Sequence, residues 1–383
     1  MGGSVSQQRL LDEFEWFHSH PELSCAEFDT TVRIKAALSQ AGIAVLAGNP
    51  PLKTGLVAEI QGGLPGKTVA LRADIDALPV NEETAVPYRS RNAGCMHACG
   101  HDFHMAALLG AALLLAEKRP ELRGSVRFVF QPSEEVPGGA LSVLQTGLLD
   151  TVSEIYGFHA MPNLKSGVVA VKDGATFGST ARFAISVQGK GGHAAMPELC
   201  KDPLVAAAAL VCAAQTVISR NTNPFDTAVL SFTRIESGSA WNIVPDTAFI
   251  EGTIRGLGEG NCKRAAEQLE RMCGGIALAY NVSIDFKPEF DSPSTNNDKT
   301  LCDFLWKLAE GNGYEVEEFT PTLGGEDFAY YQKRIPGVFF CFGVDSPFGL
   351  HHPKFQAKTD MLFQAARLMA LIAESALARL AQG

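Results

Sequence analysis

Residues 96–104 contain three histidines, a cysteine and an aspartate, the densest group of potential metal ligands in the sequence. A glycine-bearing loop at 92–95 precedes them, and an apolar stretch at 106–116 predicts a helix directly after them. A thiolate and imidazoles near the start of a helix suit a borderline-soft divalent ion such as Zn²⁺, Mn²⁺ or Co²⁺. We therefore expect a metal site here, with further ligands supplied by other parts of the chain.

Further acidic and imidazole residues follow predicted strands, where ligands of open α/β sheets usually bind. They are Asp74 and Asp76 after 68–72, Glu134 and Glu135 after 125–130, His159 after 155–158, and His351 and His352 after the strand that begins at 337. A single histidine at a strand end is usually structural, and a pair of glutamates usually lies in a solvated turn. Together with Cys99 and His101 they predict one crevice, in which crowded carboxylates and imidazoles would be costly without a cation.

The adjacent glutamates suggest two different roles. Neighbouring side chains of an extended segment point to opposite sides. One carboxylate can therefore bind metal while the other faces the substrate water as a general base. A dinuclear centre would polarise a scissile carbonyl and lower the pKa of the water.

The pattern of elements predicts two architectures. Strands and helices alternate up to about residue 178 and again after 290, which favours a mixed, mostly parallel sheet with helices on both faces. The opening segment, 7–41, has helical periodicity. Between these parts, 181–286 read as βαββαβ, the ferredoxin-like α+β unit. We expect a catalytic domain in two parts, 1–178 and 291–383, with an inserted lid or dimerisation domain at 179–290.

Length and composition limit the possible functions. The 383 residues favour two domains, and a net charge of −10 argues against a nucleic-acid partner. Nine scattered cysteines without framework spacing suggest a reducing compartment, so we expect a cytoplasmic protein without a signal peptide. The apolar stretch at 106–116, read as the longest in the chain, is too short to span a membrane. No membrane partner is expected.

Four motifs together resemble a known family. They are RADIDALP at 72–79, MHACGHD at 96–102, QPSEE at 131–135 and GGHAA at 191–195. These motifs resemble the aminoacylase and carboxypeptidase superfamily of dinuclear metallopeptidases, and within it the amidohydrolases that include hippurate hydrolase and indole-acetyl-amino-acid hydrolase. The resemblance extends in order from 18–23 to 350–355, nearly the whole chain.

The resemblance implies a role for individual residues. It implies two divalent metal ions per subunit (Zn, Mn, Co or Ni) and five metal ligands, which are Cys99, His101, Glu135, His159 and His351. Glu134 matches the general base, and Asp76 matches a carboxylate that orients the ligands. His193 matches a histidine that reaches across a dimer to hold the reacting carbonyl oxygen, so a homodimer or homotetramer is implied. Asn242 and Arg255 resemble the region that binds the substrate carboxylate.

The implied activity is that of a metal-dependent amidohydrolase, which cleaves the linear amide of an N-acyl amino acid into a carboxylic acid and a free amino acid. Two alternatives remain open at this stage. A dipeptidase or carboxypeptidase would use the same metal centre with a different acyl-side pocket. A non-catalytic ligand-binding homologue would keep the scaffold, although such a protein has no need for both Glu134 and the full ligand set.

Overall fold

The computed structural model describes residues 6–382, so the first five residues, on which the expectation about a signal peptide partly rests, lie outside it. The chain divides into two compact units. The first unit comprises Met1–Gly174, Asn297–Thr320 and Tyr330–Gly383, and the second comprises Ala175–Asn296 and Pro321–Ala329. The return segment 321–329 groups with the second unit because Thr322 N–H donates to Thr176 O and Gly178 N–H donates to Gly324 O. The interval 179–290 expected from the sequence does not include this segment.

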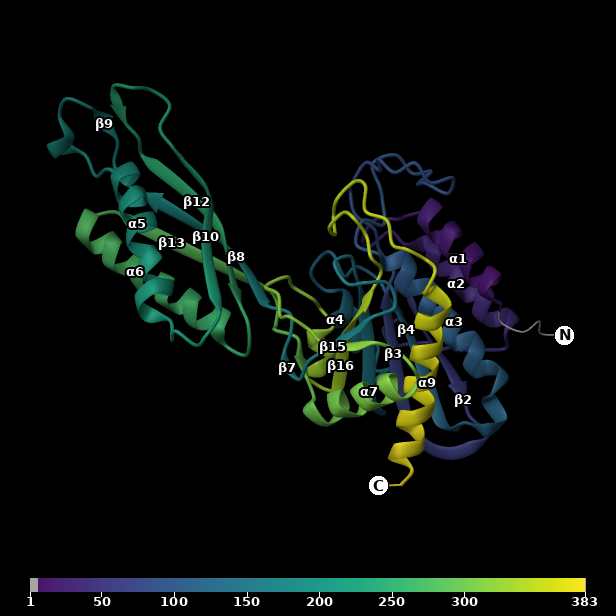
Figure 1. The fold of residues 1–383 in the computed structure, drawn as a ribbon. Helices are drawn as coiled ribbons and strands as arrows, with labels where there is room; N and C mark the ends of the chain where they lie inside the picture. Colours follow the sequence, from purple (N-terminus) through teal and green to yellow (C-terminus); the bar gives the residue numbers. More distant parts are fainter. Residues whose placement is uncertain (1–5, 383) are drawn as a thin grey trace. The chain divides into compact units, whose positions relative to one another are not determined.

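The first unit is built around an eight-stranded mixed sheet with the order β1-β2-β4-β3-β5-β16-β6-β15 (Figure 1). Its strands are β1 (Ala44–Val45), β2 (Leu56–Gln61), β3 (Leu64–Asp74), β4 (Arg123–Gln131), β5 (Val152–Met161), β6 (Val169–Val171), β15 (Val316–Glu318) and β16 (Gly337–Gly343). The four neighbours β4, β3, β5 and β16 run parallel. Their carboxyl ends therefore meet at one edge of the sheet, which is the edge that the acidic and imidazole residues follow.

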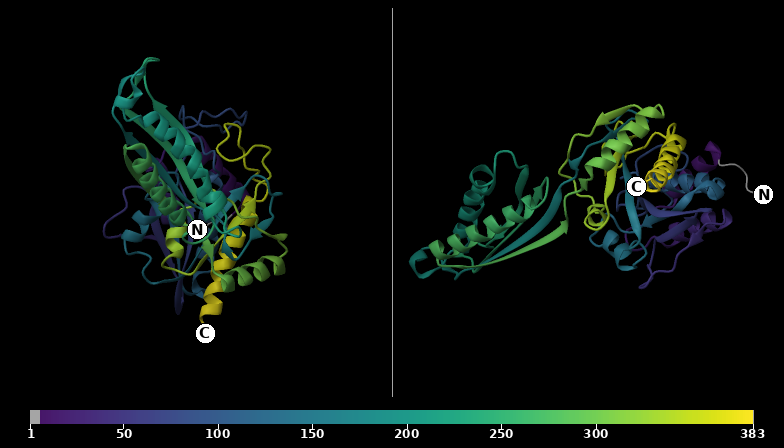
Figure 2. Two further views of the ribbon diagram at one scale, coloured as in Figure 1. Left: turned by 90° about the vertical axis from the view of Figure 1, so that its left-hand side faces the viewer. Right: turned by 90° about the horizontal axis from the view of Figure 1, so that it is seen from below.

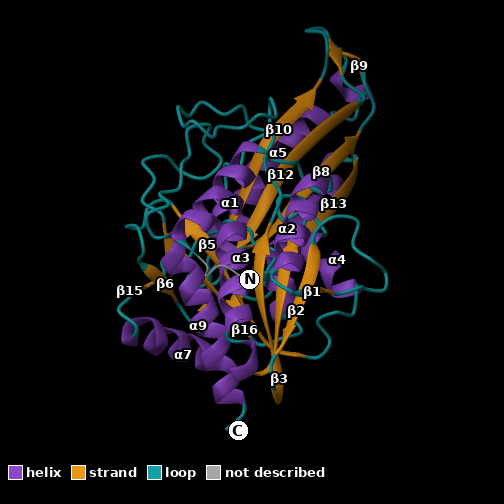
Figure 3. Ribbon diagram, turned by 90° about the vertical axis from the view of Figure 1, so that its right-hand side faces the viewer, coloured by secondary structure: helices purple, strands orange, loops and turns teal. Residues whose placement is uncertain are grey.

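Helices pack on this sheet and on one another, as Figure 3 shows for α1, α2, α3 and α9. The helices of the first unit are α1 (Gln7–Ser19), α2 (Phe28–Gln40), α3 (His101–Glu117), the 3₁₀ turn Arg119–Glu121, α4 (Gly139–Gln145), α7 (Lys299–Gly311) and α9 (Leu362–Leu380); α8 (Ala329–Gln332) begins at the boundary between the units. Helix α3 contacts α9, α1 and β3, and after its first turn it is apolar on all sides, as is typical of a helix inside the core.

The segment 7–41, which has helical periodicity, forms two helices separated by 20–27. Pro21 has no N–H to continue the first helix and disfavours helical geometry at the residue before it. Cys25 has a φ of +66°, a left-handed conformation that also prevents helix continuation. The resulting loop lies beside the metal centre described below.

The second unit contains an antiparallel four-stranded sheet with the order β10-β12-β8-β13. Its elements are β8 (Ser179–Gln188), β9 (Gly192–His193), the 3₁₀ turn Pro197–Leu199, α5 (Pro203–Asn221), β10 (Ala228–Ser237), β11 (Ile243–Val244), β12 (Thr247–Gly256), α6 (Asn261–Tyr280) and β13 (Ser283–Ser292). Helices α5 and α6 pack side by side on one face of this sheet (Figure 2). Elsewhere β7 (Gly174–Ala175) pairs with β14 (Asn296–Asn297). The expected fold class, a mixed sheet domain with an inserted ferredoxin-like unit, is confirmed.

Helix α5 corrects the expectation about apolar stretches. Its 19 residues are long and apolar enough to cross a membrane by length and composition. An 18-residue window within it has a mean hydropathy of 1.5, and a third of that window is buried. Length and composition do not distinguish a membrane span from a helix that packs on its own sheet. Ala206, Leu210, Ala214 and Val217 of α5 are fully buried in the core of the second unit.

Candidate metal centre

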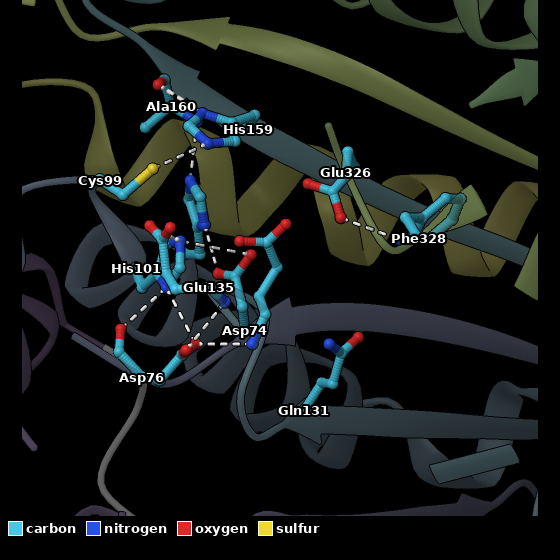
Figure 4. A network of polar contacts seen from close by, with 12 residues as sticks. Asp74, Asp76, Cys99, His101, Gln131, Glu135, His159, Ala160, Glu326 and Phe328 are labelled. Atoms are coloured by element: carbon cyan, nitrogen blue, oxygen red, sulfur yellow. Dashed lines mark hydrogen bonds and ion pairs between the residues drawn. The ribbon is translucent and has the colours of Figure 1, made fainter. Parts of the chain in front are cut away.

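The five predicted ligands lie together at the carboxyl edge of the sheet in the first unit. Their donor atoms form overlapping groups whose members lie within 4.8 Å of one another. One group is Cys99, His101 and His159, and a second is Cys99, Glu135 and His351. Cys99 is common to both groups, so its thiolate could contact two ions. Figure 4 shows several of these side chains converging on one region.

A left-handed glycine separates the first two ligands. Gly100, with a φ of +87°, is the N-cap of α3 and lies between Cys99 and His101. A Cβ atom at this position would lie 3.1 Å from Cβ of Ala160, and the left-handed conformation itself disfavours other residues. This turn lets Cys99 and His101 reach a common point, which an uninterrupted helix would not allow for residues two apart.

Backbone partners select the tautomers of two histidines. The Nδ1 atom of His101 lies 2.8 Å from the carbonyl oxygen of Asp76, and Nδ1 of His159 lies 2.8 Å from that of Ala160. A carbonyl oxygen only accepts, so Nδ1 must carry the proton in both rings. In the neutral form of each ring the lone pair then lies on Nε2, which in His159 is 3.4 Å from Sγ of Cys99. Burial and the neighbouring His104 lower the pKa of His159 to about 3, which keeps its ring neutral as a ligand must be.

Two other histidines of the 96–104 segment are arranged differently. His104 uses both nitrogens, because Nε2 accepts the Ala160 N–H at 2.7 Å and Nδ1 donates to Asp74 at 2.6 Å. No lone pair remains on its ring for a metal. His97 belongs to none of the ligand groups that the described residues form. Burial lowers the pKa of His97 to about 4, so it is a neutral buried ring.

Two buried atoms of the site lack a hydrogen-bond partner among the residues that the structure describes. They are Nε2 of His101 and Oε1 of Glu135, which lie 3.9 Å apart. Oε1 of Glu135 also lies 3.3 Å from Nε2 of His351. Polar atoms buried without a partner are rare because each costs about 1–3 kcal/mol. Sulfur, nitrogen and carboxylate donors arranged in this way fit borderline divalent ions.

Asp76 holds the two glutamates in place. The N–H groups of Glu134 and Glu135 donate to its two carboxylate oxygens at 3.1 and 3.0 Å. Ser24 Oγ, from the loop after α1, donates to the same carboxylate at 2.7 Å. Burial alone would raise the pKa of Asp76, but interactions with His101 and Ser24 outweigh burial and lower it. Asp76 is therefore an ionised acceptor that fixes the backbone of the glutamate pair.

The backbone is strained at two points of the site. Ser133, directly before the glutamate pair, has a φ of +57°, and His351 has a φ of +63°. Such conformations cost free energy in residues other than glycine and concentrate at functional sites. The N–H of His351 donates to the carbonyl oxygen of Ala98 at 2.8 Å, which ties this ligand to the segment that carries Cys99.

The structure places Asp74, which the sequence predicted in the crevice without a specific role, beside His101 and His104. Asp74 is fully buried. Its Oδ2 atom lies 3.7 Å from Nε2 of His101 and accepts a hydrogen bond from Nη1 of Arg72 at 2.7 Å. It also forms the hydrogen bond to His104 described above. Residues two apart on an extended segment share a face. The spacing of Asp74 and Asp76 was therefore the available signal that both would face the site.

The second unit holds the three remaining predicted residues. His193 on β9 is exposed, and β9 pairs with β11 so that Ala194 N–H donates to Asn242 O at 3.1 Å. The structure thus brings His193 and Asn242 together. Arg255 lies at the other end of β12, eight residues from Thr247, which is about 26 Å at 3.3 Å per residue. Asn242 lies in the segment before this strand, and the role of Asn242 and Arg255 in binding the substrate carboxylate stays a prediction.

Comparisons with known proteins agree with this geometry. Residues 70–375 match the model of peptidase family M20/M25/M40. An N-acetylcysteine deacetylase of Bacillus subtilis is 42% identical over 97% of this chain and 98% of its own length. An N-acetyldiaminopimelate deacetylase of Listeria innocua is 40% identical over 81% of this chain and 84% of its own.

A solved structure is also similar over nearly its full length. The Bacillus subtilis YXEP protein, described as a dinuclear metal-binding peptidase of the M20 family, superposes with a TM-score of 0.88 at 39% identity and covers 97% of this chain and 98% of its own. The family model and the similar proteins both point to the same family. This chain belongs to the M20/M25/M40 peptidase family.

Proposed function

We propose that this protein is a metal-dependent amidohydrolase that cleaves N-acyl amino acids into a carboxylic acid and a free amino acid. The names of its relatives, deacetylases of N-acetylcysteine and N-acetyldiaminopimelate, support this class of substrate. The donor set of the first unit supports a metal-dependent reaction. Small acyl groups such as acetyl are therefore the first substrates to test.

Two divalent ions would be held by the two ligand groups that share Cys99. Zinc, manganese, cobalt and nickel all suit sulfur, imidazole and carboxylate donors, and availability often decides among them. When bound, such ions polarise a scissile carbonyl and lower the pKa of water. The tautomers of His101 and His159 are the observation that carries this proposal, because each ring has its Nδ1 bonded to a backbone carbonyl and its Nε2 left to bind metal.

Glu134 is the proposed general base. Its neighbour Glu135 belongs to a ligand group with Cys99 and His351, while the N–H groups of both glutamates are fixed by Asp76. In the proposed reaction, Glu134 takes a proton from the water that attacks the amide carbon. It then gives this proton to the amine nitrogen as the C–N bond breaks, which releases the amino acid.

His193 is proposed to hold the carbonyl oxygen of the substrate in a neighbouring subunit. Its Nδ1 accepts the N–H of Ala195 at 3.1 Å, so the proton of the neutral ring lies on Nε2. An exposed Nε2–H is a donor, as stabilisation of a developing oxyanion requires. We therefore propose a homodimer or a homotetramer as the working assembly, and a cytoplasmic location in keeping with the free cysteines.

The test is hydrolysis of a panel of N-acetyl and longer N-acyl amino acids, with dipeptides as the competing class. Metal-free protein, made by dialysis against a chelator, is compared with protein reloaded with Zn²⁺, Mn²⁺, Co²⁺ or Ni²⁺. The proposal expects higher kcat/KM on N-acyl amino acids than on dipeptides, with activity restored by metal. Preference for dipeptides would instead identify a dipeptidase, and ligand binding without turnover of any substrate would identify a non-catalytic homologue.

A further inference from the structure

The motif that opens the family resemblance, at residues 18–23, has no part in the proposed chemistry, yet its first histidine is buried beside the metal-binding segment. His18 belongs to α1, and its side chain is 3% exposed. Its Nδ1 lies 2.6 Å from Oδ2 of Asp102, a residue 84 positions away in the sequence. Its Nε2 lies 3.1 Å from Oε1 of Glu82. His18 thus connects two buried carboxylates from two different segments.

The geometry sets the charge of His18. Both ring nitrogens face carboxylate oxygens, and a neutral imidazole has only one N–H to donate. Bonds to both carboxylates therefore require the imidazolium form. Burial alone lowers the pKa of His18, but the bonds to Asp102 and Glu82 outweigh burial and raise it to about 9. Removal of this cation would leave two buried carboxylates without their main partner, which is costly.

Asp102 joins this cation to the ligand segment. It directly follows His101 and lies three residues after Cys99. Its second oxygen, Oδ1, accepts the N–H of Phe103 at 2.8 Å in the first turn of α3. The Asp102 carboxylate therefore contacts His18 of α1 through one oxygen, and it accepts a backbone N–H at the start of α3 through the other. Gly100, just before this turn, offers little conformational resistance of its own.

Glu82 extends the same connection to the loop between β3 and α3. It accepts the N–H of Ser90 at 2.6 Å and the hydroxyl of Thr84. Leu78 and Met96 exchange two backbone hydrogen bonds, N–H to carbonyl oxygen in both directions. These bonds close the loop between the two residues, and Glu82 lies within it. Of the two carboxylates that contact His18, Glu82 thus belongs to the loop before Cys99 and His101, and Asp102 directly follows His101.

We infer that His18 is a positioning residue of the metal centre, which holds the start of α3 through Asp102 and so fixes Cys99 and His101 for metal binding. This inference rests on the proposed metal-dependent function. Partners that orient metal ligands typically contribute about 10–100-fold in metal affinity. His18 acts through one further residue, so the lower end of this range, about tenfold, is expected.

The experiment measures zinc affinity of metal-free protein by competition with a chromophoric chelator, with thermal unfolding of the same metal-free samples as a second readout. His18→Gln and Asp102→Asn should each weaken zinc binding by about tenfold. The matched control is His20→Gln. His20 lies in the same motif, but its ring stacks on Trp16 and bonds to Trp16 O, away from the ligand segment. Its zinc affinity should stay within about twofold of the wild type, whatever its change in Tm.

A double variant shows whether His18 and Asp102 affect zinc binding through one another or independently. If His18 acts through Asp102, His18→Gln combined with Asp102→Asn should weaken zinc binding by less than the product of the two single effects. In cobalt-loaded protein, the thiolate-to-metal absorption band should shift in the His18 and Asp102 variants and stay unchanged in His20→Gln. This band reports the contact with Cys99, which a general loss of stability would not alter.

The inference is overturned if His18→Gln binds zinc within twofold of the wild type, or if His20→Gln loses as much affinity as His18→Gln. Should His18→Gln fail to fold, the near-isosteric Asp102→Asn and Glu82→Gln decide, and unchanged affinity in both overturns it. A wild type that binds no zinc would overturn the proposed function together with this inference. Tight wild-type binding with unaffected variants would overturn the inference alone.

Discussion

Glu135 Oε1 lies 3.3 Å from His351 Nε2, although 216 positions separate the two residues in the sequence. The pair joins the segment after β4 to the segment after β16, and it shares a ligand group with Cys99. His351 is the more accessible member, with 55% of its side chain exposed. These two residues therefore offer a way to perturb metal binding with little change to the core.

Metal content should fall when a ligand is removed. His351→Ala and Cys99→Ala should each lower both the bound metal per chain and the activity, because each removes a donor atom. His351→Ala should leave the Tm of the metal-free protein nearly unchanged, since this side chain is exposed. Elemental analysis of dialysed protein gives the stoichiometry, with His352→Ala as the neighbouring control. Wild-type metal content and affinity in both variants would remove these residues from the site.

Glu134→Gln should keep its metal and lose turnover. The amide preserves the size of the side chain but cannot take a proton at neutral pH. Loss of a general base typically lowers kcat by on the order of 10²–10⁴. Metal content and kcat measured on the same sample test the role, and a variant with wild-type kcat would show that another group is the base.

Stability should depend on pH through His18. Its pKa is raised to about 9 from 6.5, so the folded chain binds this proton more tightly than the unfolded chain. Its contribution is therefore complete below about pH 6.5 and is lost as pH rises through about 9, with a slope of at most about 1.4 kcal/mol per pH unit for one proton.

The measurement is urea unfolding of metal-free protein between pH 6 and 10, for the wild type and for His18→Gln. The difference in unfolding free energy between the two should shrink as pH rises through this window. A difference that stays constant with pH would contradict the proton linkage. The charged neighbours Asp102 and Glu82 are present in both proteins, so the comparison isolates His18.

Asn242 and Arg255 should differ in their effects on substrate binding. Arg255 lies near the end of β12, about 26 Å along the strand from its start at Thr247 at 3.3 Å per residue, and Asn242 precedes this strand. We therefore expect that one substrate carboxylate does not contact both residues in one copy of the second unit. We expect Asn242→Ala, next to the His193 strand, to raise KM by more than Arg255→Ala does. Steady-state kinetics on an acid and on its matched amide would show which residue senses the carboxylate.

Activity should be restored between two inactive subunits. If His193 serves a neighbouring active site, Glu134→Gln mixed with His193→Ala should recover part of the wild-type rate after subunit exchange. One site of the mixed dimer then has both a base and a partner histidine. Each variant alone, taken through the same exchange, is the control. Full activity in a monomeric protein, or no recovery despite proven exchange, would exclude this arrangement.

Much of the fold was readable from the sequence because it depends on local periodicity. Alternating strands and helices predicted the mixed sheet, and the βαββαβ order predicted the ferredoxin-like unit. Helical periodicity over 7–41 did not show where the first helix ends, which Pro21 and Cys25 decide between α1 and α2. The return of 321–329 to the second unit also had no local signal, because it depends on hydrogen bonds to residues near 176 and 178.

The sequence by itself determined which donor types are present and in what order, because the ligand spacing around Gly100 and the paired glutamates are properties of short segments. Only the tertiary structure decided which nitrogen of each histidine can bind metal. That choice depends on the Asp76 carbonyl for His101, and on Asp74 and the Ala160 N–H for His104, which come from β3, the loop after it and β5. The tertiary structure also placed His18 between Asp102 and Glu82, and these contacts form only when α1 packs beside the start of α3. Hydrogen-bond partners so far apart in sequence are set by packing, and no local pattern encodes them.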